Sequence, residues 1–498
     1  MLLYCKNNKN RSIFIKFVCR IVIMGENSVA TAVAEEILSQ LPYNPNEGQM
    51  ELIAAFGKFV ADNAEKSLFV LNGYAGTGKT TIAGALVKAL TELGIRSVLL
   101  APTGRAAKVF SAYSGHAAYT IHHHIYQSRK FDPQAMSFSL KKNNYKDTYF
   151  IVDEASMVSN TSGENVVFGT GRLLDDLITY VYGGENCHLI FLGDVAQLPP
   201  VGYTDSPALS PEYLHGYGLT VYCYSLTEVA RQQYDSGILK NATEVRKIIS
   251  SGNLEAPMIY TSHYRDVEVV TGEFLTDLID DCYRCDGIEE TIIVTRSNKS
   301  AVMFNRGVRA RVLDMESELD VGDMLLVAKN NYFWTDEKDD QMDFIANGDM
   351  AIVRSLGFVD KIHGFRFADA TLEFPDYKRE FDVKIILDAL YSEAPALRRD
   401  QNERLFQSVQ ADYMDIPRKG ERYKKIKEDV FFNALQVKFG YSVTCHKAQG
   451  GQWKNVFVDM SYIPDDAFAN LDFYRWLYTS FTRSYGKIYL INSSLPTV

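Results

Sequence analysis

The sequence predicts an α/β protein with two parallel-sheet domains and a small β-barrel-like module inserted into the second. First, short apolar runs typical of buried strands alternate with segments of helical periodicity up to residue 192. Second, strand-like runs return after residue 290 and near the C-terminus. Strands that alternate with helices indicate parallel sheets covered on both faces. Third, the pattern breaks over 322–437, where short alternating strands precede a charged helical stretch at 397–429.

Each element follows from its residue pattern. Apolar residues at helical spacing predict helices over 29–41, 48–65 and 80–93. Short runs rich in apolar and β-branched residues predict strands over 68–72, 97–101, 149–152, 188–192, 291–295, 455–460 and 487–491. Alternation in the module predicts strands over 350–353 and 365–374. These elements divide the chain into an N-terminal extension (1–24), a first domain (25–225) with a hairpin inserted near 126–148, a second domain (226–321 and 438–498), and the inserted module (322–437).

The composition is that of a folded globular protein, with 46% apolar and 23% charged residues in a chain of 498. It excludes a mostly disordered chain, a collagen-like chain and a disulfide-rich miniprotein. The net charge of −10 argues against a protein that coats nucleic acid through bulk charge, but it leaves a local basic groove open. Seven irregularly spaced cysteines indicate reduced thiols, and hence a cytoplasmic protein.

The N-terminal stretch is not expected to insert into a membrane. Lys16 and Arg20 interrupt its most apolar part, and no run approaches the ~20 apolar residues of a membrane span. Met24 precedes a polar, helix-like start. We therefore expect residues 1–23 to be an upstream extension from a misplaced start codon, which detection of Met1 on the natural protein by mass spectrometry would refute.

The strongest chemical signal is a glycine-rich loop that follows a strand and opens a helix, Gly73-Tyr-Ala-Gly-Thr-Gly-Lys79-Thr80. Its glycines let backbone N–H groups wrap phosphates, and the helix N-terminus adds a partial positive charge. Lys79 is expected to reach the β- and γ-phosphates of ATP and Thr80 to hold Mg²⁺. The candidate nucleotide-binding residues of this loop are Gly73, Gly76, Thr77, Gly78, Lys79, Thr80 and Thr81.

Two acids that end a predicted strand supply the second half of such a site. Asp153 is expected to contact Mg²⁺ directly or through water, and Glu154 to polarise the attacking water. A polar turn after the 188–192 strand carries Gln197, which can sense the γ-phosphate or its water. Together these residues predict nucleoside triphosphate hydrolysis. Alone, the Gln197 turn is more typical of a loop stiffened by the prolines that follow it.

Further segments match a known family in order and spacing. They are Ala101-Pro-Thr-Gly-Arg-Ala-Ala-Lys108, Thr120-Ile-His122, Leu226-Thr-Glu-Val-Ala-Arg231-Gln232, Val443-Thr-Cys-His-Lys-Ala-Gln-Gly450 and Tyr478-Thr-Ser-Phe-Thr-Arg483. With the loop and the acids, they resemble the superfamily-one DNA helicases of the RecD-like branch over about residues 44–490. The resemblance implies two RecA-like motor domains, an inserted hairpin and an inserted SH3-like β-barrel.

The resemblance also implies further roles at the nucleotide. Arg231 and Arg483 would reach the γ-phosphate from the second domain, where a guanidinium can stabilise the charge that develops on the transferred phosphoryl group. Gly450 would lie against the nucleotide. Gln49 resembles a glutamine that pairs with the adenine edge, which would favour ATP.

The strand-contacting candidates carry hydroxyl, imidazole or ammonium groups, which suit phosphate oxygens without reading sequence. They are Thr103, Lys108, Thr120, His122, Thr444, His446 and Lys447. In the 126–148 interval, Phe131 and Phe138 are interleaved with Lys and Arg, a pattern that favours base stacking and that resembles a duplex-splitting hairpin. The alternative is an ordinary surface hairpin with one aromatic side chain in the core.

The sequence thus predicts an ATP- and Mg²⁺-dependent DNA helicase that translocates on single-stranded DNA and acts on tailed duplexes as a monomer. The direction, 5′ to 3′, is inherited from the resemblance alone. A DNA-stimulated ATPase that remodels protein–DNA complexes without unwinding, a regulatory ATP-binding switch and an RNA substrate remain alternatives. The interval 158–186 is expected to be a flexible loop with one helix near 172–182, and it or 322–437 could bind a protein partner.

Overall fold

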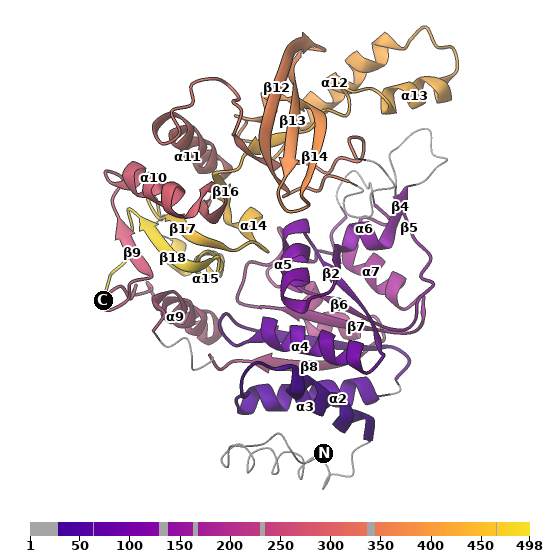
Figure 1. Cartoon of the computed structure of the whole chain (residues 1–498), viewed down its shortest axis with the longest axis vertical. Helices are drawn as coiled ribbons and strands as arrows, with labels where there is room; N and C mark the ends of the chain where they lie inside the picture. Colours follow the sequence, from indigo (N-terminus) through magenta and orange to yellow (C-terminus); the bar gives the residue numbers. More distant parts are fainter. Residues whose placement is uncertain are drawn as a thin grey trace.

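The computed structural model describes residues 28–62, 64–128, 138–162, 168–229, 235–335, 344–464 and 466–498. Two parallel sheets and one antiparallel sheet dominate it, and the antiparallel sheet projects beyond the two others (Figure 1). The α/β class with parallel sheets is therefore confirmed. Phe131 and Arg231, two of the predicted site residues, lie outside the described residues. In the described part of the chain, no helix is both long and apolar enough to cross a bilayer.

The first sheet is entirely parallel, in the order β3-β2-β6-β7-β1-β8. Its strands are β1 (Ser67–Gly73), β2 (Arg96–Ala101), β3 (Ala118–Thr120), β6 (Lys146–Val152), β7 (Glu185–Gly193) and β8 (Thr220–Leu226). Its helices are α2 (Ser28–Gln40), α3 (Glu47–Ala61), α4 (Lys79–Glu92), α5 (Gly104–Ser114), α6 (Ile121–Ile125), α7 (Leu173–Val181) and α8 (Pro211–His215). Phe69 and Leu71 of β1 pack into one core and Leu68 and Val70 into another. Burial on both faces explains why this strand reads as a continuous apolar run.

The segment after β6 is anchored to the first domain, and α7 confirms the helix predicted near 172–182. The carboxylate of Asp176 on α7, 3% exposed, accepts hydrogen bonds from the Tyr126 hydroxyl (2.7 Å) and from the backbone and hydroxyl of Thr170 (3.0 and 2.9 Å). Tyr126 begins β4 (Tyr126–Ser128), which pairs with β5 (Phe138–Leu140). Gly169 has φ +45°, and a Cβ there would stand 2.1 Å from the Asp176 carboxylate. Helix α7 therefore braces the base of the hairpin.

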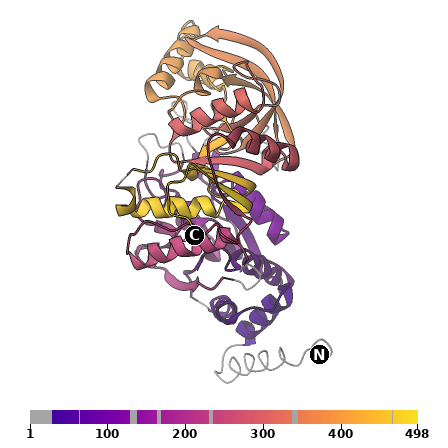
Figure 2. The same cartoon turned by 90° about the vertical axis from the view of Figure 1, so that its left-hand side faces the viewer.

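The second sheet is also entirely parallel, in the order β16-β10-β17-β18-β9. Its strands are β9 (Val267–Val270), β10 (Thr291–Thr295), β16 (Ser442–Thr444), β17 (Trp453–Asp459) and β18 (Ser484–Ile491). Its helices are α9 (Gly237–Ser251), α10 (Leu275–Asp286), α11 (Asn298–Arg311), α14 (Cys445–Ala448) and α15 (Leu471–Phe481). Short 3₁₀ turns occur at Ala155–Met157, Pro207–Leu209, Ile288–Glu290, Leu387–Ala389 and Ala467–Ala469. The second domain packs beside the first, and the inserted sheet stands above both (Figure 2).

The inserted segment forms an antiparallel sheet in the order β14-β13-β12-β11-β15. Its strands are β11 (Met324–Val327), β12 (Met350–Ile362), β13 (Phe365–Phe374), β14 (Arg379–Ile386) and β15 (Val437–Phe439), and α12 (Arg399–Asp412) and α13 (Lys419–Lys427) follow β14. A bridge between Ile385 and Leu435 links β14 to the residues before β15, so the sheet curls on itself. Because β15 pairs with β11, the sheet extends to Phe439, two residues beyond the predicted boundary at 437.

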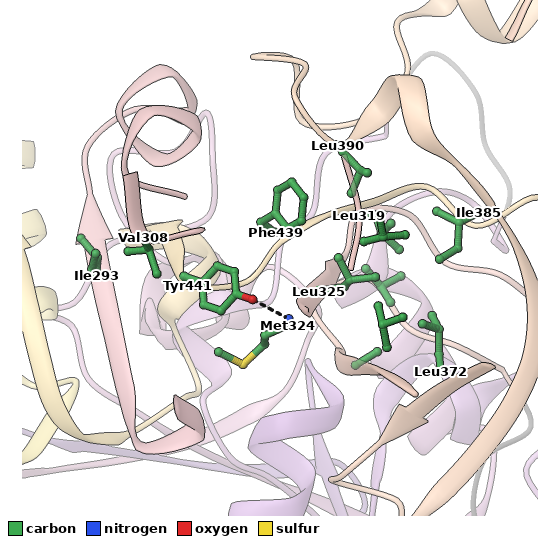
Figure 3. Packing of buried hydrophobic residues seen from close by; sticks show 14 of the residues in the cluster. Ile293, Val308, Leu319, Met324, Leu325, Leu372, Ile385, Leu390, Phe439 and Tyr441 are labelled. Atoms are coloured by element: carbon green, nitrogen blue, oxygen red, sulfur yellow. Dashed lines mark hydrogen bonds between the residues drawn. The ribbon is translucent and has the colours of Figure 1, made fainter. Parts of the chain in front are cut away.

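A buried ion pair joins the insert to the second domain. The Arg309 guanidinium on α11 donates to both carboxylate oxygens of Asp323 at 2.8 Å, and to the Ser317 carbonyl and the Tyr391 hydroxyl at 2.9 Å. The Tyr441 hydroxyl donates to Asp323 at 2.9 Å and accepts from the Met324 backbone at 3.1 Å. Figure 3 shows the apolar residues of this junction as one continuous core shared by the two parts of the chain.

We predict that Arg309→Ala lowers the free energy of unfolding by about 3–5 kcal/mol, because it leaves the fully buried Asp323 carboxylate without its cation. Arg311→Ala is the matched control, since it removes an exposed arginine from the same helix and is expected to cost less than about 0.5 kcal/mol. Urea titrations of the three proteins measure the difference. Equal midpoints for Arg309→Ala and Arg311→Ala would contradict this account of the junction.

Candidate nucleotide site in the interdomain cleft

The site lies at the carboxyl edge of the first sheet. Strands β6, β7 and β1 are neighbours, and the chain leaves them at Asp153, Asp194 and Gly73 respectively. Because parallel strands end at one edge, these residues converge there. They line a cleft of ≈ 830 Å³ whose opposite wall belongs to the second domain. That wall includes Gly450 and Arg483, so the structure brings the predicted residues of both domains to one cavity.

The glycine-rich loop has the backbone that its sequence predicts. Gly76 and Gly78 adopt φ +72° and +83°, in the left-handed region that favours glycine. Helix α4 begins at Lys79, so its unpaired N-terminal N–H groups point into the cleft region. A Cβ on Gly73 would stand 2.9 Å from the Lys79 side chain, and one on Gly78 would stand 2.6 Å from Gln49. A side chain at either glycine would therefore displace Lys79 or Gln49.

Gln49 lies behind this loop rather than in the cleft. Its amide nitrogen donates to the Thr77 carbonyl at 2.9 Å, and its amide oxygen accepts from the Asn46 backbone at 3.1 Å. The Asn46 side chain accepts from the Gln49 backbone in return, which completes a capping box on α3. With 2% exposure, Gln49 supports the loop in this conformation. Its predicted contact with adenine stays a prediction.

The two acids differ in their surroundings. Asp153 accepts hydrogen bonds from the Tyr113 hydroxyl (2.8 Å) and the Glu154 backbone (2.9 Å), and burial raises the pKa of its carboxyl while the nearby Lys79 opposes that rise. Glu154 has φ +50°, a strained backbone conformation that often occurs at functional sites. Tyr113 was missed from the sequence because its spacing from Phe110 on α5 predicts an ordinary core residue.

Orphaned polar atoms show what the cleft is built to hold. Glu154 Oε2 and Gln197 Oε1 are buried, and neither has a hydrogen-bond partner among the residues that the structure describes. Buried polar groups are nearly always satisfied in folded proteins, so these two oxygens point to a polar ligand or a water molecule beside Lys79. Hydroxyl and carboxylate oxygens from Thr80 and Asp153 line the same cleft, and they are the ligand type that Mg²⁺ prefers. The residues therefore fit a magnesium–nucleotide complex.

Arg483 enters the cleft from the second domain but is held by its own domain. Its guanidinium donates to the carbonyls of Thr479 and Gly451 and to the Thr482 hydroxyl, each at 3.1 Å. It is 2% exposed. A contact with a γ-phosphate would therefore replace at least one of these bonds.

The predicted strand-contacting residues separate into two groups. Thr103, Thr120 and His122 line one groove of ≈ 1100 Å³ between the first domain and the insert, whereas Lys108, Thr444, His446 and Lys447 are absent from its lining. The hydroxyls of Thr103 and Thr120 cap α5 and α6, and Lys108 pairs with Asp376 of the insert at 2.5 Å. Burial lowers the pKa of His122 to about 4, so its imidazole is neutral at pH 7. Tyr332, Phe344 and Asn433 of the insert form part of the opposite wall.

Phe138 packs at the base of the hairpin. Its ring stacks on Phe168 with centroids 4.8 Å apart and contacts Tyr332 of the insert at 4.5 Å. This matches the alternative in which one hairpin aromatic belongs to a core. A role for Phe131, the other predicted stacking residue, stays a prediction because it lies outside the described residues.

Comparisons with known proteins agree with this arrangement. Residues 45–248 match the family described as an AAA domain, and residues 439–491 match the UvrD-like helicase C-terminal domain. The chain is 27% identical over 290 residues to the ATP-dependent DNA helicase dda of Enterobacteria phage T4, which covers 56% of this chain and 60% of that protein. This chain is similar to superfamily-one DNA helicases.

Three other comparisons cover different shares of the chain. The uncharacterized protein R530 of Acanthamoeba polyphaga mimivirus is 23% identical over 507 residues, covering 86% of this chain and 96% of that protein. The ATP-dependent RecD2 DNA helicase of Deinococcus radiodurans is 32% identical over 134 residues, covering 27% and 16%. A crystal structure of the Pif1 helicase from Bacteroides in complex with ADP-AlF3 and ssDNA gives a TM-score of 0.45 at 15% identity, covering 90% and 92%. The chain spans about 60% of the length of dda.

The N-terminus of α5 packs against a buried carboxyl group of the insert. Asp349 is 2% exposed; it accepts from the Ala346 backbone at 2.7 Å and from the Tyr377 hydroxyl at 3.2 Å. Burial raises its pKa to about 7. A Cβ on Gly104, the first residue of α5, would stand 2.7 Å from this carboxyl group. The helix that carries Thr103 as its cap is thus fixed directly against the insert.

We predict that Asp349 makes the protein less stable as the pH rises from about 4 toward 7. Its folded-state pKa lies above the unfolded value of about 3.9. Between these two pH values the Asp349 carboxyl is protonated in the folded protein but ionised in the unfolded chain. The free energy of unfolding therefore falls as the pH rises through this window. Asp349→Asn removes this titration but keeps the size of the side chain. Melting temperatures measured at intervals from pH 5 to 8 should therefore fall less steeply for the variant. Parallel curves for the two proteins would contradict the prediction.

Proposed function

We propose that this helicase binds Mg²⁺ and ATP in the interdomain cleft, hydrolyses the ATP, and uses the cycle to translocate on single-stranded DNA and unwind a tailed duplex. The observation that carries the proposal is the composition of the cleft. The glycine-rich loop and the acids Asp153 and Glu154 form one wall, and Arg483 on the other wall comes from the second domain. Because the two walls come from different domains, binding, hydrolysis and release of ATP would change the relative position of those domains.

The residues of the cleft suit that chemistry. When bound, Mg²⁺–ATP supplies the phosphoanhydride that is cleaved and a metal ion that offsets its charge. Lys79 and the loop N–H groups hold the phosphates, while Thr80 and Asp153 hold the metal. Glu154 orients the attacking water and accepts its proton, with Gln197 beside it. Arg483, together with Arg231 by sequence, stabilises the charge on the transferred phosphoryl group, and Gly450 and Gln49 complete the nucleotide contacts.

The DNA path in this proposal runs across the domains and the insert. The hydroxyl, imidazole and ammonium groups at 103–122 and 444–447 contact the strand, and the groove beside Thr103 receives it. The curled sheet of the insert acts as the SH3-like barrel, and the 126–148 hairpin separates the strands. Each ATP closes the domains and its release opens them, which moves the grip 5′ to 3′ by about one nucleotide, as in the branch that the sequence resembles.

A second function is a DNA-stimulated ATPase that remodels protein–DNA complexes without unwinding. The packing of Phe138 favours it, because a ring held between Phe168 and Tyr332 is not free to wedge a base pair apart. Both functions use the same ATP site. They differ only in strand separation, so one assay distinguishes them.

We predict that the helicase separates a partial duplex with a 5′ single-stranded tail, and not one with a 3′ tail, in the presence of ATP and Mg²⁺. Lys79→Ala is the control, since loss of the phosphate-binding ammonium should abolish both hydrolysis and unwinding without unfolding the chain. Strand separation and phosphate release are measured on the same samples. DNA-stimulated hydrolysis without separation of either duplex would support the remodelling function, and full turnover by Lys79→Ala would refute the site.

A further inference from the structure

Helix α15 of the second domain contacts the glycine-rich loop through one tyrosine hydroxyl. The Tyr478 hydroxyl accepts a hydrogen bond from the Ala75 backbone N–H at 2.9 Å and donates one to the Asp194 carboxylate at 2.6 Å. Tyr478 is 1% exposed, and Asp194 is 2% exposed. A single hydroxyl therefore connects the second domain to two chain segments that form the first domain's side of the cleft.

The neighbouring residue of α15 reinforces this connection. The Thr479 hydroxyl accepts from the Leu198 backbone N–H at 2.9 Å, and the Gln449 side chain donates to the Leu198 carbonyl at 2.8 Å. The side chains of Ala196 and Leu198, which belong to the first domain, pack in the core of the second. The Asp194–Leu198 loop, which includes Gln197, is thus held by the second domain at both its backbone and its side chains.

The same helix leads directly to the predicted arginine. Arg483 follows α15, and its guanidinium donates to the Thr479 carbonyl at 3.1 Å. Tyr478 fixes α15 against Ala75, three residues before the Gly78–Lys79 end of the loop. The position of Arg483 relative to Lys79 therefore depends on the bonds that Tyr478 makes across the cleft.

We propose that Tyr478 is a positioning residue of the ATPase site, whose hydroxyl holds α15 in register with the glycine-rich loop so that Arg483 can reach the γ-phosphate. This inference rests on the proposed function. Tyr478 does not touch the nucleotide; it acts through Arg483, whose helix its bonds to Ala75 and Asp194 hold in place. A misplacement of about 1 Å at a reacting group can cost on the order of 100-fold in rate, so the loss of two short hydrogen bonds at this point has a measurable effect.

The test is Tyr478→Phe, which keeps the ring and removes only the hydroxyl. With saturating single-stranded DNA we expect kcat for ATP to fall by about ten- to a hundredfold, while KM for ATP and the Kd for a fluorescent ADP analogue stay nearly unchanged. A residue that acts through Arg483 has no effect once Arg483 is gone. The double variant Tyr478→Phe/Arg483→Ala should therefore hydrolyse ATP no more slowly than Arg483→Ala alone.

Tyr474→Phe provides the matched control on the same helix. Tyr474 is fully buried, and within the described part of the chain its hydroxyl bonds to the carbonyls of Glu255 and Phe468, both in the second domain. We expect its kcat to equal that of the wild type. Multiplicative losses in the double variant, a raised Kd for the ADP analogue, or the same kcat loss in Tyr474→Phe would each overturn the positioning role. Absence of ATP hydrolysis in the wild type would instead refute the proposed function.

Discussion

The rest of the structure depends on the packing of two first-domain loops, one with Tyr74 and one with Ala196 and Leu198, against the second domain. Ala196 and Leu198 lie in the second domain's core, and the Tyr74 ring packs against that core beneath the Arg246 guanidinium at 4.4 Å. Both loops leave the carboxyl edge of the first sheet, where parallel strands must end together. The cleft is therefore walled by two domains, and any change in their relative position moves the loop that would bind phosphate and the residues that would sense it.

Helix α5 connects the cleft to the groove between the first domain and the insert. Its cap, Thr103, lines that groove, while Tyr113 near its other end donates to Asp153 in the cleft. Near the start of α5, the Arg105 guanidinium carbon lies 3.9 Å from the centroid of the Trp453 ring, and the guanidinium donates to the Gln452 carbonyl of the second domain. One short rigid element thus contacts the groove, the opposite domain and the carboxylate that suits a metal ion.

The sequence predicted the strands that show a clear apolar pattern and the residues that belong to motifs. It did not predict the residues whose contacts are made with distant parts of the chain. Strands such as β10 and β13 were predicted at their observed bounds because burial on both faces, or strict alternation, leaves a clear signal. The edge strands β3 and β9 were missed because their 3 and 4 residues are too few to show a clear alternation. The loop, the acids and Arg483 were predicted from motifs. Tyr113 and Tyr478 were not predicted as site residues. Their hydroxyls bind carboxylates 40 and 284 residues away in the sequence, and contacts at such separations produce no local sequence pattern. In the interval 158–186 the helix near 172–182 was predicted, but the bonds from Tyr126 and Thr170 to Asp176 were not, since they join residues without a recognisable spacing.

The most direct test of the divided site is a structure of the whole chain with Mg²⁺, a non-hydrolysable ATP analogue and a short oligodeoxynucleotide. The account predicts a γ-phosphate between Lys79 and Arg483, with the Arg483 guanidinium released from the Gly451 carbonyl that holds it here. It also predicts the oligonucleotide in the groove beside Thr103. A nucleotide held by the first domain alone, with Arg483 still bonded to Gly451, would contradict it.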